Sequence, residues 1–244
     1  MPSIINAARD WLAPTGRLRV GLNLANPLLI NQADGLTEPS GIAPDLAREL
    51  ARRLCVPVSF VLYQGPGELA DDANADAWDV GLIGADPLRA GDIAFTSAYL
   101  LIDATYLVPP GSMLRTQVDV DREGVRIALF ERSAYDLYLR RTLKHAELKG
   151  ADSIESSFQL FRSQHLDALA GLRPYLIAKQ ERLPGSRVLE GRFTAIQQAI
   201  GTPKSRTQGA QYLQRFVEEA VNEGLIARII DRNEVRGVNV ASQA

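Results

Sequence analysis

The chain has 244 residues, of which 46% are hydrophobic and 23% charged, and its formal net charge is −2 at pH 7. This length supports two lobes with separate cores, whereas the charge provides no field for nucleic acid or for an anionic membrane surface. The lone Cys55 excludes an intrachain disulfide and a thiolate metal cage. No segment reaches the roughly 20 apolar residues of a membrane-spanning helix, so membrane insertion is not expected.

The N-terminal segment does not read as an export signal. Residues 2–16 contain Arg9 and Asp10 where a signal peptide has its apolar core, and they lack a basic start. With Met1 as the native start, we therefore expect a cytoplasmic protein. If a signal peptide has been removed ahead of this sequence, the expected compartment is the periplasm.

Strand and helix patterns alternate along the first part of the chain. Period-two and buried apolar runs predict strands over residues 18–24, 56–63 and 80–83. Between the first two, an amphipathic helix is predicted over residues 44–54, and a second apolar run ends at Val108. Alternation of this kind predicts mostly parallel sheets with right-handed crossovers.

A run of turn residues, Pro109-Pro110-Gly111-Ser112, interrupts this pattern, and a second α/β series follows it. Its predicted elements are strands over 125–130, 166–170 and 187–189 and helices over 133–143, 154–164 and 174–181. A strand over 194–201, a long helix over 206–223 and a shorter one to about 233 complete the chain. We expect a second lobe (112–190) inserted into the first (1–108 and 194–244), with hinges at about 108–111 and 190–194.

The segment from Asp79 to Pro109 holds the first candidate site. A buried strand runs into Asp86-Pro87-Leu88-Arg89, where Asp86 suits a helix N-cap and Pro87 the first helical position. Arg89 is then expected in the first helical turn at the C-terminal end of a strand, where open α/β sheets bind ligands. Gly84 and Asp86 border the same position. The alternative is a surface arginine that pairs with Asp92.

Five segments in this order resemble a known family. They read GRLRVGLNL, GIAPDLARELARRL, WDVGLIG, PLRAGDIAFTSAY and AIQQAIGTPK, and the resemblance extends from about residue 17 to about 233. The family is that of the family 3 extracellular solute-binding proteins of amino-acid-type ABC importers. The resemblance implies a two-lobed, type II periplasmic-binding-protein-like α/β fold that closes on its ligand. An ABC-transporter permease is the protein partner that the resemblance suggests. It also implies that Arg89 grips a ligand carboxylate through its planar guanidinium.

The resemblance places a second set of ligand contacts at the turn Glu131-Arg132-Ser133-Ala134. Family members there usually have Gly followed by two hydroxyl residues, which offer hydroxyls and backbone N–H groups to the carboxylate. This chain keeps Ser133 but has Arg132 and Ala134 beside it. The spacing of Ser133 and Asp136 also fits a capping box, so Ser133 is interpreted as a cap, a ligand contact or both.

The main departure from the family lies after the predicted strand at 166–170. Amino-acid binders carry an Asp near the place of Leu172 to hold the ligand's ammonium group, whereas this chain has Leu172 followed by Arg173. An ammonium group buried there would be unpaired, which is costly. We therefore expect a small carboxylate that is not an ordinary α-amino acid, such as a dicarboxylate that meets Arg89 and Arg173. The alternative for Arg173 is a solvated residue at a helix start.

Three polar residues complete the candidate ligand site. Asn23 and Asn26 follow the first strand, where the family usually presents an aromatic ring, and Asn26 equally suits a turn before Pro27. The pair Gln197-Gln198 lies in an apolar strand, so one of the two amides must face inward and needs a partner. Gln197 is taken as the candidate ligand contact, with a buried structural amide as the alternative.

Signals for catalysis and cofactors are weak. The sequence has no phosphate-binding loop, nucleotide glycine fingerprint or nucleophile elbow, and His145 and His165 lack metal-ligand spacing, so neither cofactor nor metal is expected. The expected protein is a monomeric binding protein without nucleic-acid partners. Two alternatives stay open, namely a cyclohexadienyl-dehydratase-like enzyme that uses Glu131 and a cytoplasmic ligand sensor.

Overall fold

The computed structural model describes residues 2–31 and 38–242. Met1, on which the expected compartment depends, lies outside the described residues. The chain forms two compact units, unit 1 (Met1–Leu101 and Gln197–Ala244) and unit 2 (Ile102–Ile196), so the second is inserted into the first. Within the described part of the chain, none of the helices is both long and apolar enough to cross a membrane.

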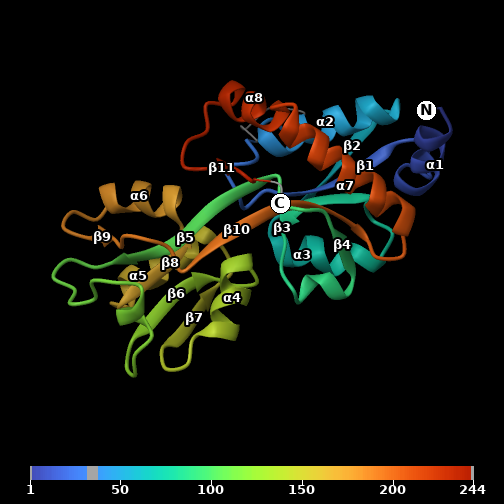
Figure 1. Ribbon diagram of the computed structural model, residues 1–244. Helices are drawn as coiled ribbons and strands as arrows, with labels where there is room; N and C mark the ends of the chain where they lie inside the picture. The colour runs from blue at the N-terminus through green and yellow to red at the C-terminus, as the bar shows by residue number, and fades with distance from the viewer. Residues whose placement is uncertain (1, 32–37, 243–244) are drawn as a thin grey trace. The chain divides into compact units, whose positions relative to one another are not determined.

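Unit 1 is an α/β unit with a mixed sheet of parallel and antiparallel strands (Figure 1). Its helices are α1 (Pro2–Leu12), α2 (Ile42–Leu54), α3 (Pro66–Asp71), α7 (Thr207–Asn222) and α8 (Leu225–Arg232). Its strands are β1 (Leu18–Asn23), β2 (Val58–Tyr63), β3 (Val80–Gly84), β4 (Ile93–Phe95) and β11 (Asn239–Val240), together with parts of β5 (Leu100–Val108) and β10 (Thr194–Pro203).

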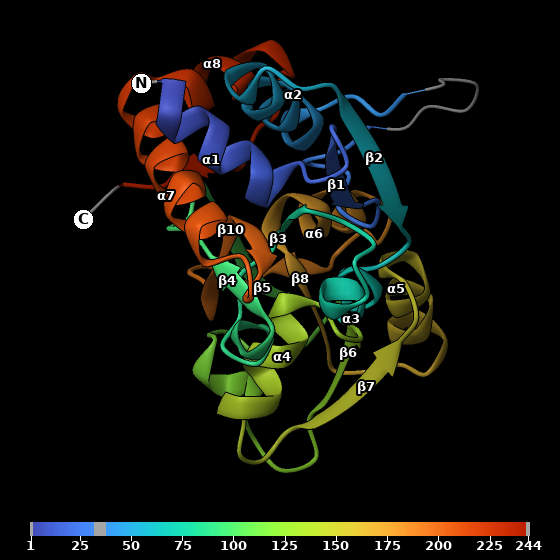
Figure 2. The same ribbon diagram turned by 90° about the vertical axis from the view of Figure 1, so that its right-hand side faces the viewer.

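In the sheet of unit 1, β1 pairs in parallel with both β2 and β3, and β10 runs antiparallel beside β3 and β4. One face of these strands meets α3, where side-chain atoms of Leu69 and Trp78 lie against Gly21 and Gly81. The helices α1, α2, α7 and α8 pack on one another, and α2 contacts β1 and β2 (Figures 1 and 2). A side chain at Gly81 would collide with Leu69, because a Cβ built there lies 2.9 Å from Leu69 Cδ2.

Unit 2 has the same strand plan on a smaller scale. Its strands are β6 (Arg126–Phe130), β7 (Glu147–Ala151), β8 (Ala168–Leu172) and β9 (Arg187–Val188), and its helices are α4 (Ala134–Thr142), α5 (Ile154–Ser163) and α6 (Arg173–Glu181). Here β6 pairs in parallel with β7 and β8, and β5 runs antiparallel beside β8 and β9. Figure 2 shows α5 alongside these strands, and its Phe158 and Phe161 form the core with Leu169 and Leu176.

An arginine–aspartate pair recurs at the start of the parallel strands in both units. Arg19 of β1 donates its backbone N–H and guanidinium to Asp79, the residue before β3. Arg126 of β6 does the same to Asp167, the residue before β8. In each unit the pair joins two neighbouring strands at their amino-terminal ends. The strand plan of unit 1 is therefore repeated in unit 2.

The unit boundaries differ from the expected hinges. The chain crosses between the units after Leu101 and after Ile196, whereas the hinges were expected at 108–111 and 190–194. Both crossings fall inside long strands, β5 and β10, which continue from one unit into the other. The turn residues Pro109 to Ser112 belong to unit 2. They break the local strand pattern but do not mark the boundary between units.

Candidate functional site

The candidate residues of unit 1 meet at one edge of its sheet. Asn23 is the last residue of β1 and Gly84 the last residue of β3, and the carboxyl ends of parallel strands lie at the same edge. Gln197 reaches this edge from β10, because its carbonyl oxygen accepts a hydrogen bond from Ala85 N–H at 2.8 Å. The topology thus brings together three residues that are far apart in the sequence.

Arg89 is buried at this edge rather than solvated. Its residue exposure is 7%, and its Nη1 donates to the carbonyl oxygen of Gly84 at 2.7 Å. Asp92, the partner in the surface-pair alternative, accepts a hydrogen bond from Asn74 at 2.7 Å. A buried arginine beside the end of a central strand is costly unless its guanidinium is well partnered, so its position favours a specific role over a solvated one.

The turn that positions Arg89 is tighter than predicted. Asp86 Oδ1 accepts from Leu88 N–H at 2.9 Å in an Asx turn, but the segment that follows is not an α-helix. The Asp86 carbonyl accepts from Arg89 and Ala90, and a single 3-10 turn, Arg89–Gly91, follows. The predicted helix start is therefore wrong. Arg89 nevertheless lies near the C-terminal end of a strand, as the sequence predicts.

Asn23, at the end of β1, and Asn26 after it both form turns. Asn23 Oδ1 accepts from Ala25 N–H at 3.1 Å, and Asn26 Oδ1 accepts from Leu28 N–H at 3.2 Å. Asn26 is 6% exposed, and Asn23 is half-buried. The side-chain oxygen of Asn26 therefore stabilises a turn, as the alternative interpretation expects. A ligand carboxylate could be bound by either residue only through the amide NH2 group, because an amide oxygen is not a donor.

The glutamine pair divides between the two faces of β10. Gln197 is exposed and Gln198 is buried, with 4% exposure. Gln198 is thus the inward-facing amide, and its backbone carbonyl accepts from Tyr99 N–H at 2.9 Å. Gln197 has the exposure that contact with a ligand requires.

In unit 2 the turn after β6 is organised by a reciprocal capping arrangement. Ser133 Oγ accepts from Asp136 N–H at 3.1 Å, and Asp136 Oδ2 accepts from Arg132 N–H at 2.7 Å. The Ser133 hydroxyl donates to the carbonyl oxygen of Phe130 at 2.8 Å, so its proton is already used. Ser133 therefore serves as the N-cap of α4. Its hydroxyl can add an acceptor but not a donor to a ligand.

Asp136 is the buried carboxylate of this turn. Its residue exposure is 1%, and this burial raises its pKa, while the Arg132 N–H and the Arg140 guanidinium act in the opposite direction. Arg140 Nε donates to Asp136 Oδ1 at 2.7 Å. Arg132 itself has φ 58, the left-handed conformation that a glycine adopts more easily. The family's glycine preference at this place thus corresponds to a real backbone demand, which Arg132 meets with strain.

Arg173 has structural partners that the sequence does not reveal. Its Nη1 and Nη2 each lie 3.4 Å from the carbonyl oxygen of Leu189, and Nη2 also donates to the carbonyl oxygen of Gly191. Its Nε lies 4.0 Å from Asp103 Oδ2, and Arg192 Nη1 lies 2.7 Å from Asp103 Oδ1. Two guanidinium groups therefore share one carboxylate of β5. This arrangement favours the structural interpretation of Arg173.

Leu172 and Glu131 lie at the carboxyl ends of β8 and β6. Leu172 is 7% exposed and immediately precedes Arg173 at the start of α6. Glu131 is exposed, and its Oε1 lies 3.8 Å from Arg140 Nη2. Glu131 thus forms a loose, solvent-exposed ion pair with Arg140. Among the residues that the structure describes, no cluster of histidine, cysteine and carboxylate side chains could hold a metal ion.

A family model identifies the chain over most of its length. The model for bacterial extracellular solute-binding proteins, family 3, matches residues 18–233. The chain belongs to this family. The match includes β1, β3, both long crossing strands and the helical tail to α8. No curated protein sequence matches the chain significantly.

Several solved structures of binding proteins have a similar fold. A mutant of ArgBP from T. maritima is 21% identical with a TM-score of 0.75, over 93% of this chain and 99% of that one. An ABC-transporter binding component from Wolinella succinogenes DSM 1740, complexed with lysine, is 19% identical with a TM-score of 0.75, over 89% and 95%. The ancestral amino-acid-binding protein AncCDT-1, a precursor of cyclohexadienyl dehydratase, is 19% identical with a TM-score of 0.74, over 92% and 98%. At these identities the similarity shows the fold alone, and it confirms the expected type II periplasmic-binding-protein-like α/β fold.

Proposed function

We propose that this member of the family binds a small carboxylate without a free α-amino group and performs no chemistry on it. The observation that carries the proposal is Arg89, buried at the sheet edge of unit 1 and held by the Gly84 carbonyl. A guanidinium fork in this position suits bidentate recognition of a carboxylate. Candidate contacts beside it are Gly84, Asp86, Asn23, Asn26 and Gln197. In unit 2 they are Ser133, Arg132, Leu172 and Arg173.

The proposed ligand class follows from the charges around Leu172. An α-ammonium group needs a carboxylate partner, and Leu172 supplies none. The carboxylate near this strand end, Asp103, already pairs with Arg192 and lies near Arg173. Because two guanidinium groups neutralise one acid, the surroundings favour an anion over an ammonium group. Arg173 is proposed to act through this positive charge, since its N–H groups already bind carbonyls.

Arg89→Ala tests the site. It should abolish binding of the best carboxylate while the circular dichroism spectrum stays unchanged, with a loss of about 2 to 5 kcal/mol in binding free energy. Arg52→Ala is the matched control, because the Arg52 side chain is 71% exposed on α2. Wild-type affinity in the Arg89 variant, measured by titration calorimetry, would show that Arg89 does not bind the ligand.

A thermal-shift panel tests the ligand class. Each amino acid is paired with the acid that lacks its amino group, and dicarboxylates are included. A ligand at 100 times its dissociation constant adds about 2.7 kcal/mol, which corresponds to several degrees for a chain of this size. We expect stabilisation by the deaminated acids. Stabilisation confined to the amino acids would contradict the proposed class while leaving the Arg89 site intact.

The binding-protein proposal includes delivery of the ligand to an ABC-transporter permease in the periplasm, as a monomer. It is supported by the family, whose description is extracellular. Closure of the two units on a ligand is proposed as the mechanism, because a ligand that contacts both stabilises the closed form. Detection of the native protein in a periplasmic extract of its host would support this location. Its exclusive recovery with the cytoplasm would contradict it.

The enzymatic alternative rests on Glu131. This carboxylate is exposed and pairs loosely with Arg140, which favours a solvated role over that of a general acid. We therefore expect prephenate and arogenate to remain unchanged after long incubation with micromolar protein. Formation of phenylpyruvate or phenylalanine that is lost in Glu131→Gln would establish the enzyme instead.

A further inference from the structure

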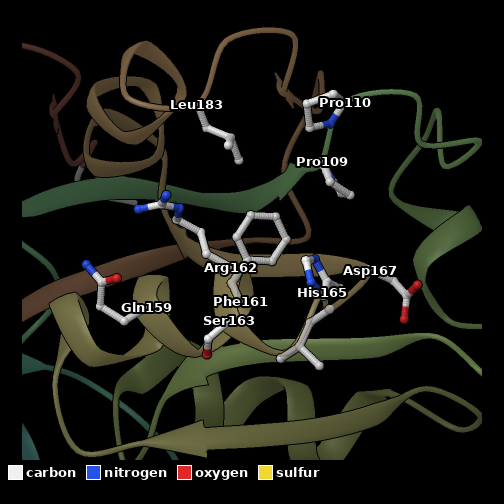
Figure 3. A pocket seen from close by; sticks show the side chains of 10 residues that line it. Pro109, Pro110, Gln159, Phe161, Arg162, Ser163, His165, Asp167 and Leu183 are labelled. Carbon is white, nitrogen blue, oxygen red and sulfur yellow. The ribbon is translucent and has the colours of Figure 1, made fainter.

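Unit 2 contains a pocket of about 530 Å³ that none of the candidate ligand residues lines. Figure 3 shows it between the segment after β5, the C-terminal part of α5 and the turn after α6. Its lining combines an apolar surface with a polar rim. The apolar residues are Pro109, Pro110, Phe161, Leu166 and Leu183.

The pocket lies at the opposite end of β8 from the candidate site. Leu166 and Asp167 immediately precede β8, whereas Leu172 ends it. Pro109 follows the end of β5, which runs antiparallel to β8 with Leu107 opposite Leu169. At about 3.3 Å per residue, the two ends of this strand segment are separated by roughly 16 Å. The pocket is therefore distinct from the edge at which Leu172 and Arg173 lie.

The apolar surface of the pocket is rigidly supported. Phe161 and Leu166 are 2% and 1% exposed and belong to the core of unit 2, so they form a fixed floor. In Figure 3, Leu183 and Pro109 lie across from the Phe161 ring. A preformed apolar pocket of this size is typical of sites for small organic molecules. It favours an occupant with an aliphatic or aromatic body.

The charge at the rim is positive. Arg162 is exposed, and its guanidinium carbon lies 5.7 Å from the centre of the Phe158 ring. Within residues 2–31 and 38–242, no carboxylate forms an ion pair with Arg162. The acid of the rim, Asp167, accepts from Arg126 N–H at 2.8 Å and from Arg126 Nε at 3.3 Å. An occupant with an anionic head would thus meet an uncompensated cation.

We propose that this pocket is a second small-molecule site, for an amphipathic anion whose apolar body lies over Phe161 and whose carboxylate meets Arg162. The inference does not depend on the proposed function, because it uses other residues at another edge of the sheet. Octanoate is a suitable probe, and 1-octanol is its neutral counterpart with the same apolar body.

The test uses the Arg89→Ala protein, so that the proposed carboxylate site cannot contribute. In this background octanoate should bind, and Arg162→Gln should weaken its binding about fivefold, as expected for one solvent-accessible ion pair. Binding of 1-octanol should not change. Arg182→Gln is the matched control, because Arg182 also lies over the Phe158 ring, at 5.3 Å, but pairs with Glu155 and does not line the pocket.

Leu183→Asp provides a second variant, which places a like charge beside the apolar body. It should abolish octanoate binding, and perturbed methyl resonances of Leu166 and Leu183 should locate the ligand in the unsubstituted protein. Absence of octanoate binding at millimolar concentration would overturn the proposal. Equal weakening by Arg162→Gln and Arg182→Gln, or perturbed resonances confined to other residues, would overturn it as well.

Discussion

Replacement of Asp79 by Ala should be among the most destabilising single changes in unit 1. The side chain is fully buried, and its two oxygens accept from Arg19 N–H at 2.8 Å, from Arg19 Nε and Nη2 at 3.1 and 2.8 Å, and from Arg206 Nη1 at 2.7 Å. Removing the acid leaves two guanidinium groups without their buried partner and one strand N–H without an acceptor. Breaking such a buried pair costs about 3 to 5 kcal/mol.

The equivalent pair of unit 2 supplies the control. Asp167 and Arg126 have the same connectivity, but their side chains are 39% and 40% exposed. A solvent-exposed pair contributes at most about 1 kcal/mol, so Asp167→Ala should have a small effect. The two variants are compared by thermal unfolding followed by far-UV circular dichroism, which reports on the helices and strands of both units.

The expected change in melting temperature for Asp79→Ala is a decrease of roughly 6 to 20 °C, from about 2 to 4 °C per kcal/mol for a chain of this size. Asp167→Ala should lower it by no more than roughly 4 °C. The reasoning would be refuted if the two variants were destabilised equally. Equal effects would mean that burial does not determine the strength of these pairs.

Three further predictions concern titration and backbone strain. The Arg52 guanidinium lowers the pKa of Glu49 to about 2, so the contribution of Glu49 to stability is present above pH 4.5 and lost as the pH falls toward 2. Glu49→Gln should therefore lower the free energy of unfolding by about 1 to 2 kcal/mol at pH 6. Near pH 2 the variant and the wild type should be equally stable in acid unfolding. Burial raises the pKa of Asp136 above its ordinary 3.8, so its contribution is present below pH 3.8 and lost as the pH rises through the folded-state value. Urea unfolding from pH 3 to 7 should therefore show Asp136→Asn gaining stability relative to wild type as the pH rises, and a constant difference would contradict this. Cys55, which follows α2 with φ 53, is in the left-handed conformation that glycine adopts without strain. Cys55→Gly should therefore relieve roughly 0.5 to 1 kcal/mol of strain and raise the melting temperature. A lower melting temperature in the variant would contradict this prediction.

The regular elements could be predicted because their signals are local. The helix α2 and the strands β1 and β3 follow directly from hydrophobic periodicity, and only their ends differ by a few residues. The strand β7, with the sequence ELKGA, was missed because only Leu148 and Ala151 have apolar side chains and the strand is held in the sheet by its backbone pairing with β6. The exposure of Cys55 likewise depends on how the end of α2 packs, which the sequence does not reveal.

The candidate site was predictable in its location but not in its interactions. The position of Arg89 follows from a strand and the turn after it, which are adjacent in the sequence. The partners of Arg173 are not adjacent, since Asp103 belongs to β5 and Leu189 follows β9. Local patterns cannot reveal contacts of this kind, because pairing across a sheet depends on topology. The unit boundaries were misplaced for the same reason, since β5 and β10 are each continuous across them.

The insertion of unit 2 has a consequence for synthesis of the chain. Unit 2 is continuous in sequence and can fold as soon as residue 196 has left the ribosome, whereas β3 and β4 must wait for β10. At about 5 to 20 residues per second, the edge of β3 stays unpaired for on the order of 10 s. The strand Val80–Gly84 is fully buried in the folded protein, so its unpaired edge can act as a template for association with other chains during that interval. The nascent chain therefore depends on a strand that is synthesised late, and its vulnerability to aggregation lies in the half that is synthesised first.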